Sequence, residues 1–226
     1  QLEESVSRLV QTCPPCSECV ILNLGDFFHA HDDTNRTKKS GHPVDVSDRF
    51  PKVYQAGLHA LISCVEAARK HHRKIIVKNL IGNHDDHTAL TLSIALDAWF
   101  HRDPRVHVDT SPAMIWYHGF HKVMIAATHG HMIKPNEVGG VMAHDQPDLW
   151  ASTKHRYCYM GHVHHSSKGI SNESPGVKWE TFRTLAAKDA WHAAQKYRSG
   201  RDMYAIVHDR DHGETERHRV DVGMLE

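Results

Sequence analysis

The chain has 226 residues, a length that suits one domain with a hydrophobic core of its own. Its 27 basic and 27 acidic residues cancel, which argues against a broad nucleic-acid-binding field and against a polybasic membrane patch. Apolar residues make up 40% of the chain and charged residues 24%, a balance typical of globular proteins and not of disordered ones.

Short apolar runs alternate with helical patterns in the first half of the chain. The runs at residues 20–24 and 74–81 each end at a turn containing glycine, which predicts two strands buried on both faces. Apolar residues recur every three or four positions over residues 50–72, and residues 88–101 are similarly rich in Leu, Ile and Ala. Both segments are therefore predicted to be helices.

The second half of the chain is richer in strand patterns. Residues 118–121 are predicted to join two neighbouring strands. Residues 209–213 are predicted to connect the two strands of a closing hairpin. Residues 182–202 fit either a helix or a loop. The predicted strands are residues 113–117, 122–128, 156–160, 203–208 and 215–222. Without a repeat or linker, residues 1–226 are predicted to form one α/β domain with helices around mixed sheets.

The five cysteines indicate a reducing compartment. Cys13, Cys16 and Cys19 follow the spacing C-x2-C-x2-C, while Cys64 and Cys158 stand alone. An odd total argues against a disulfide framework, and the absence of a signal peptide or a long apolar run predicts a cytoplasmic protein without a membrane partner. Three thiolates could hold zinc or part of an iron–sulfur cluster, but no fourth cysteine follows, so a structural role is favoured.

Residues able to bind metal follow four of the predicted strands. Histidine, the commonest metal ligand, occurs 23 times, and position must distinguish ligands from surface residues. Ligands of open α/β sheets bind beyond the carboxyl ends of the strands, so four such ends can converge on one site. The residues at these ends are Asp26, then Asn83, His84 and Asp85, then His129, and finally His162 and His164.

The donor types favour particular ions. One carboxylate, one amide and three imidazoles, without a thiolate, favour Mn, Fe, Zn or Ni over Ca or Mg, which prefer sites made of oxygen alone. Two such cations held close together would activate a water and clamp a phosphate group.

The same residues resemble the motifs of the calcineurin-like metallophosphoesterase superfamily. The matching motifs are Gly25-Asp26, Gly82-Asn83-His84-Asp85, Thr128-His129 and Gly161-His162-Val163-His164. The resemblance implies a double β-sheet sandwich flanked by helices, with two divalent metal ions at one edge. Mn²⁺ is the expected ion, with Fe, Zn, Ni or Mg as alternatives. The segment from Gly25 to His29 further resembles the SbcD-type nuclease branch of this superfamily.

The resemblance also implies a role for each metal ligand. Asp26 would bridge the two metals. Asn83, His129 and His162 would complete one metal site, and His164 would serve the other.

Further residues would act on the substrate. By resemblance, His84 would protonate the leaving oxygen or stabilise the phosphoryl transition state, with Asp85 orienting it, and His29 would lie on the substrate side. His131 is either a phosphate contact or a surface residue. Arg36 could likewise reach a substrate phosphate or belong to a solvated loop.

One motif of the superfamily has no counterpart. Its members begin with Asp-x-His at the end of the first strand, and nothing before Asp26 fits that pattern. We expect the motif to lie upstream of Gln1, because a domain without a central strand would expose unpaired sheet edges. If the motif is truly absent, the chain would bind one metal or none at that site and would be inactive.

The predicted function is that of a metal-dependent phosphoesterase. It would hydrolyse a phosphodiester, in DNA, another nucleic acid or a nucleotide, by a metal-activated water assisted by His84. The alternatives are a non-catalytic protein-binding module on the same fold and a nucleotide or phosphomonoester hydrolase, because a fold alone does not choose the substrate. The sequence predicts no oligomeric state.

Overall fold

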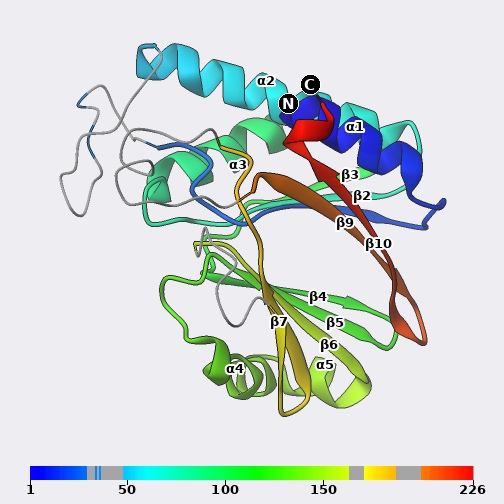
Figure 1. Cartoon of the computed structure of the whole chain (residues 1–226). Coiled ribbons are helices and arrows are strands. Elements are labelled where there is room, and N and C mark those ends of the chain that lie inside the picture. Colours follow the sequence, from blue (N-terminus) through cyan, green and yellow to red (C-terminus); the bar gives the residue numbers. More distant parts are fainter. Residues whose placement is uncertain (30–33, 35, 37–47, 163–170, 187–199, 226) are drawn as a thin grey trace.

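The protein is a mixed α/β structure, as predicted from the alternating sequence pattern. The structure, a computed structural model, describes residues 1–29, 34, 36, 48–162, 171–186 and 200–225 (Figure 1). Among these described residues, no helix is both long and apolar enough to cross a membrane.

The first sheet is parallel and has the strand order β1-β2-β3. Its strands are β1 (Cys19–Asn23), β2 (Ile75–Asn79) and β3 (Val106–Asp109). Parallel neighbours need long crossovers, which helices α2 (Phe50–Arg69) and α3 (Asp86–Phe100) provide. The two predicted strands and two predicted helices are thereby found, with α2 ending at Arg69 rather than at residue 72. Helix α1 (Leu2–Thr12) and β3 were not predicted.

Burial of the two predicted strands differs from the expectation. Every residue of β2 is buried, as expected for a central parallel strand. Every residue of β1 is partly exposed, because β1 pairs only with β2 and forms the edge of its sheet in the described part of the chain. Both faces of β1 are nevertheless covered, because Ile21 packs against the core beneath α2, and Val20 and Leu22 pack against the layer between the sheets. The strand is therefore covered on both faces as predicted, but it is less deeply buried than β2.

The second sheet has five strands in the order β4-β5-β6-β8-β7. The predicted pair of neighbouring strands is present, antiparallel, but its first strand continues through residues 118–120, and the turn lies at His121 and Lys122. The final two strands of this sheet were not predicted. The five strands are β4 (Ile115–Phe120), β5 (Val123–Thr128), β6 (His155–Met160), β7 (Ser171–Ser174) and β8 (Val177–Thr181).

A two-stranded antiparallel sheet closes the described chain. It comprises β9 (Asp202–Asp209) and β10 (Gly213–Asp221), which match the predicted hairpin. Of the segment for which helix or loop was expected, residues 187–199 lie outside the described residues.

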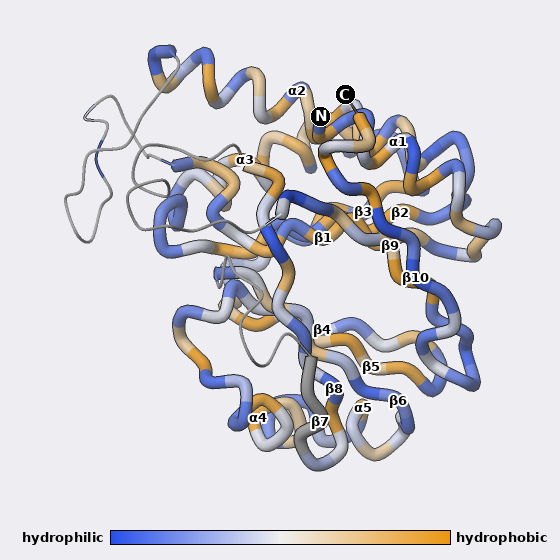
Figure 2. Tube along the Cα trace, in the orientation of Figure 1, coloured by the Kyte–Doolittle hydropathy of each residue, from blue (hydrophilic) through white to orange (hydrophobic). Residues whose placement is uncertain are grey.

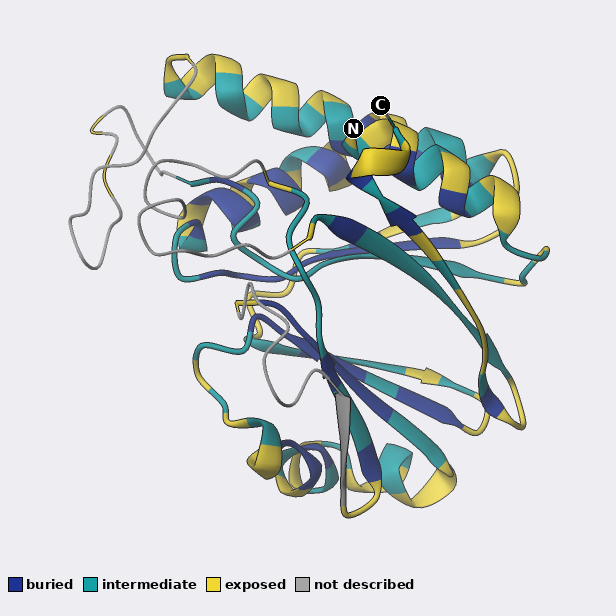
Figure 3. Ribbon diagram, viewed as in Figure 1, coloured by how far each residue is buried: buried dark blue, intermediate teal, exposed yellow. Residues whose placement is uncertain are grey.

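The two larger sheets face each other, with helices on their outer sides (Figure 1). Ile76 of the first sheet packs with Trp116 and Ala127 of the second, which makes an apolar layer between them. Helices α2 and α3 cover the outer face of the first sheet, where Val65 and Leu92 join its core. Helices α4 (Val138–Asp145) and α5 (Pro147–Ser152) lie against the outer face of the second. Figure 2 shows apolar residues, and Figure 3 buried residues, along the strands and helices that make these contacts.

A buried lysine connects the two sheets. Lys78 in β2 is only 1% exposed, and its Nζ donates to Asp109 Oδ1 at 2.8 Å and to the Ser111 carbonyl at 2.7 Å. The other carboxylate oxygen of Asp109 accepts from Trp116 Nε1 at 2.9 Å. Because Trp116 belongs to β4, the Lys78–Asp109 pair fixes the second sheet relative to the first.

A partly buried histidine makes the stability of the fold depend on pH. His208 of β9 lies beside Tyr157, at 4.6 Å between ring centroids, and its Nε2 is 2.8 Å from the hydroxyl of Tyr159. Burial lowers the pKa of His208 to about 4. Since an unfolded histidine titrates near 6.5, the unfolded chain binds this proton first as the pH falls. His208 therefore makes its full contribution to the free energy of unfolding above pH ~6.5. This contribution falls by about 3 kcal/mol as the pH drops to 4.

We expect the His208→Gln variant to lose this pH dependence, because glutamine can still accept from Tyr159 but does not titrate. The measurement is urea unfolding at pH 7 and pH 4. Wild type should lose about 3 kcal/mol more than the variant over this interval. Equal losses in the two proteins would show that His208 does not supply the dependence.

Candidate metal centre

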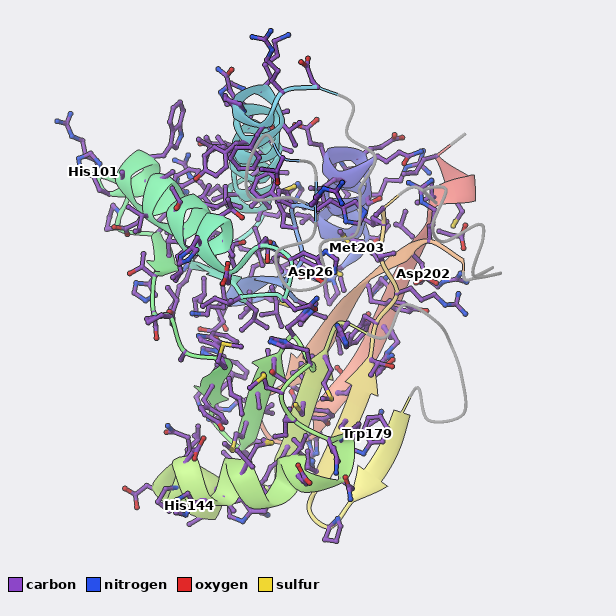
Figure 4. All side chains as sticks on the ribbon, turned by 90° about the vertical axis from the view of Figure 1, so that its left-hand side faces the viewer. Asp26, His101, His144, Trp179, Asp202 and Met203 are labelled. Carbon is purple, nitrogen blue, oxygen red and sulfur yellow. The ribbon has the colours of Figure 1, made fainter. Side chains whose placement is uncertain are left out.

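Four of the predicted ligands come together at the carboxyl ends of four strands. Asp26 and Asn83 follow β1 and β2 of the first sheet, and His129 and His162 follow β5 and β6 of the second. Within each pair the strands are parallel, so their carboxyl ends lie side by side. The contacts of His129 with Asp26 and Asn83 bring the ends of both pairs to one rim. Figure 4 labels Asp26 near the ends of the strands of the five-stranded sheet.

The ring nitrogen Nε2 of His129 is the centre of this cluster. It lies 3.1 Å from Asp26 Oδ2, 3.0 Å from Asn83 Oδ1 and 3.2 Å from His162 Nδ1. The ligand atoms of Asp26, His129 and His162 all lie within 4.8 Å of one another. His129 is buried whereas His162 is exposed, so the cluster is closed on one side and open to solvent on the other.

The second ring nitrogen of His129 fixes its orientation. His129 Nδ1 is 2.7 Å from the Leu24 carbonyl oxygen, which can only accept a hydrogen bond. In the neutral ring the hydrogen is therefore on Nδ1, and Nε2 presents a lone pair to the cluster. Metal-binding histidines are commonly held in this way by a backbone carbonyl.

The crowding of acceptors at this point favours a cation. The cluster consists of four atoms, His129 Nε2 and its three neighbours. A single proton can lie between only two of these four atoms, so the other two face the cluster with lone pairs. A divalent cation would instead accept electron pairs from all four. Carboxylate, amide and imidazole donors without a thiolate suit Mn, Fe, Zn or Ni. The residues present therefore fit a divalent metal ion.

The ionisable groups of the cluster are electrostatically coupled. Burial alone would raise the pKa of Asp26, but the hydrogen bond and charge of His129 bring it below its ordinary value. Burial opposes the charged form of His129 too, and the Asp26 carboxylate outweighs it and raises the pKa. Burial and the charge of His129 lower the pKa of His162. The carboxylate of Asp26 is thus kept ionised, the state that binds a metal.

The backbone at the cluster adopts a rare conformation. Asp26 and His162 have φ values of 55° and 63°, a region that residues other than glycine seldom occupy. Strained residues of this kind gather at functional sites. Gly82 allows the loop after β2 to approach Asp26 closely, because a Cβ at this position would collide with the carboxylate and backbone nitrogen of Asp26.

Asp85 contacts backbone groups rather than the ring it was predicted to orient. Its carboxylate is fully buried and accepts from backbone N–H groups of the loops after β1 and β2. Burial, followed by the negative charge of Asp26, raises the pKa of Asp85 to about 6, against the opposing effect of these hydrogen bonds. The role expected for Asp85 next to His84 has no contact to support it among the described residues.

His84 lies beside Asp26. Its backbone N–H donates to Asp26 Oδ1 at 2.8 Å, and its ring Nε2 is 3.9 Å from Asp26 Oδ2. The ring Nδ1 is buried and has no hydrogen-bond partner among the residues that the structure describes. With a side chain that is 26% exposed, His84 is accessible to a small molecule at the cluster.

Two substrate-side candidates, His29 and His131, border this centre. The ring of His29 lies 5.9 Å from that of His84, and the ring of His131 lies 5.3 Å from that of His129. Arg36 is exposed, in a segment of which only part is described. His164 lies outside the described residues.

The amino-terminal cysteines form no second metal cluster with other residues that the structure describes. All five cysteines are free thiols, and the three spaced as C-x2-C-x2-C are half-buried. Burial, aided by the neighbouring thiols, raises the pKa of Cys13 to about 11 and that of Cys19 to about 12. Among the described residues, they do not gather closely enough to hold a metal.

Sequence reasoning missed the groups that hold the ligands in place. The Leu24 carbonyl and the N–H groups bound by Asp85 are backbone atoms, which nearly any residue would supply, so no sequence signal marks them.

Comparison with family models, with curated proteins and with solved structures finds no match to this chain.

Proposed function

We propose that this protein is a metal-dependent phosphodiester hydrolase. The observation that carries the proposal is the convergence of Asp26, Asn83, His129 and His162 on one point, next to the imidazole of His84. The face-to-face sheets with helices outside support the metallophosphoesterase-like sandwich that the sequence motifs imply. A bound divalent ion would lower the pKa of a water and offset the charge of a phosphate.

The chain's own residues supply orientation and a proton. Asp26, Asn83, His129 and His162 would hold the ion at the rim, where His162 leaves it open to solvent. His84 Nε2 lies too far from Asp26 for a hydrogen bond, at 3.9 Å, and so is available to a substrate. We assign His84 as the group that protonates the leaving oxygen, a role that imidazole commonly fills.

The substrate-side groups favour a phosphate ester. His29 lies next to His84 and His131 lies next to His129, and both imidazoles can donate to phosphate oxygens. The neutral net charge of the chain favours a short or single-stranded nucleic acid, or a nucleotide, over a long duplex.

The test is hydrolysis of bis(p-nitrophenyl) phosphate after chelation and return of Mn²⁺. We expect turnover that requires Mn²⁺ and falls by roughly 10²- to 10⁴-fold in His84→Ala, the range of general acid–base catalysis. Mn²⁺ binding should be unchanged in the variant, because His84 is not among the ligands. Wild-type turnover no faster than that of His84→Ala would contradict the proposal that this protein is a hydrolase.

A panel of natural esters then separates the substrate classes. Faster hydrolysis of single-stranded DNA or a cyclic nucleotide than of nucleoside monophosphates would support a diester substrate. The reverse preference would assign the protein as a phosphomonoesterase with the same metal centre.

A further inference from the structure

Asp85 is a helix N-cap residue that does not cap its helix. It precedes α3, and aspartate at this position ordinarily accepts a hydrogen bond from the first turn. The side chain of Asp85 makes no such bond. Its carboxylate instead accepts hydrogen bonds from another part of the chain.

That interaction joins two loops. Asp85 Oδ1 accepts from the N–H groups of Gly82 at 3.0 Å and Asp26 at 3.1 Å. Its Oδ2 accepts from Phe27 at 2.7 Å and from Phe28 at 3.3 Å. Three consecutive N–H groups after β1 thus point at one carboxylate, an arrangement known as an anion nest. The loop carrying Asp26 is thereby tied to the loop carrying Asn83.

The loop held in this way is the one with the rare backbone conformation. Asp26 has a φ of 55° and follows Gly25, whose φ is 89°. A non-glycine residue adopts this strained conformation only where the surroundings enforce it. Hydrogen bonds from residues 26, 27 and 28 to a single fully buried carboxylate provide that enforcement.

We propose that Asp85 is a positioning residue that acts on the metal ligand Asp26, not on His84. This inference rests on the proposed function, because it assumes that Asp26 binds a metal ion. Asp85 holds the backbone of residues 26–28 against Gly82, so that the Asp26 carboxylate meets His129 and Asn83 at the right distance. Loss of Asp85 should therefore weaken the binding of the metal while leaving the chemistry at a metal-loaded site nearly intact.

The experiment is a Mn²⁺ titration of purified wild type, Asp85→Asn and Asp103→Asn, with diester turnover recorded at saturating Mn²⁺. Asp103 is the matched control. Like Asp85 it is an aspartate that accepts from a backbone N–H, and it also accepts from arginine side chains, but it is only partly buried and lies beyond the far end of α3. A helix of 15 residues places it roughly 22 Å from Asp85. We expect Asp85→Asn to bind Mn²⁺ about 10- to 100-fold more weakly, as for other groups that orient a metal ligand.

Turnover at saturating Mn²⁺ distinguishes positioning of Asp26 from orientation of His84. We expect kcat of Asp85→Asn to return to within a few-fold of wild type. A large loss of kcat with unchanged Mn²⁺ affinity would overturn the proposal and restore the orienting role. Unchanged affinity together with a lowered melting temperature would show that Asp85 only supports the fold.

A second variant covers the case in which Asp85→Asn does not fold. Asp85→Glu keeps a carboxylate for the N–H groups but adds one methylene, which displaces the loop. It too should bind Mn²⁺ more weakly than wild type, and wild-type affinity in this variant would overturn the proposal. Absence of Mn²⁺ binding by wild type itself would instead contradict the proposed function.

Discussion

Replacing His129 with alanine is expected to abolish metal-dependent hydrolysis. Nε2 of His129 is the atom around which Asp26, Asn83 and His162 gather, so its loss removes a ligand and the centre of the cluster. Changes to groups that merely orient ligands cost up to about 100-fold, so loss of this ligand should cost at least that much. Excess Mn²⁺ should not restore turnover, because the ligand itself is missing.

The control for this variant is His107→Ala. His107 is an exposed residue of β3, away from the cluster, and should keep wild-type turnover and wild-type Mn²⁺ affinity. Hydrolysis and Mn²⁺ titration of both variants provide the comparison. Wild-type activity in His129→Ala would mean that the cluster is not the reactive site.

Replacing Lys78 with methionine is expected to destabilise the fold strongly. Methionine nearly preserves the volume but leaves the Asp109 carboxylate without its charged partner between the sheets. Removing one member of a buried ion pair typically costs about 3–5 kcal/mol. Asp109 is 23% exposed, so water can partly replace the ammonium group, and we expect about 3 kcal/mol. Urea unfolding measures the free energy directly.

A double-mutant cycle separates this pairing from simple packing. Asp109→Asn removes the unpaired charge, so Lys78→Met combined with Asp109→Asn should recover part of the stability lost in the single variant. A coupling energy above about 1 kcal/mol is expected for two groups in direct contact. Additive effects of the two changes would show that the pair contributes nothing beyond the volume of its side chains.

The sequence predicts the position of the ligands better than the framework that holds them. Asp26, Asn83, His129 and His162 each follow an apolar run, and the parallel pairing of those runs brings their carboxyl ends together. Strand β3 was missed because its four residues alternate only two valines with polar groups, too short a pattern to distinguish from a loop.

Asp85 illustrates what sequence cannot show. Its place in Gly-Asn-His-Asp indicates a site residue, but its partners are N–H groups about 58 residues earlier, brought near only by the folded sheet. The resemblance implied that the Asp85 carboxylate orients the neighbouring His84. In the structure this carboxylate contacts the loop of Asp26 instead. The partial exposure of β1 was equally hidden, because burial of a strand depends on how many neighbours it has.

The most direct test of the metal centre is anomalous diffraction from a crystal of this protein grown with Mn²⁺. We expect an anomalous peak in contact with Asp26, Asn83, His129 and His162, with the His129 ring still hydrogen-bonded to the Leu24 carbonyl. Ordered manganese found only elsewhere, with those four side chains linked to one another by hydrogen bonds alone, would contradict it.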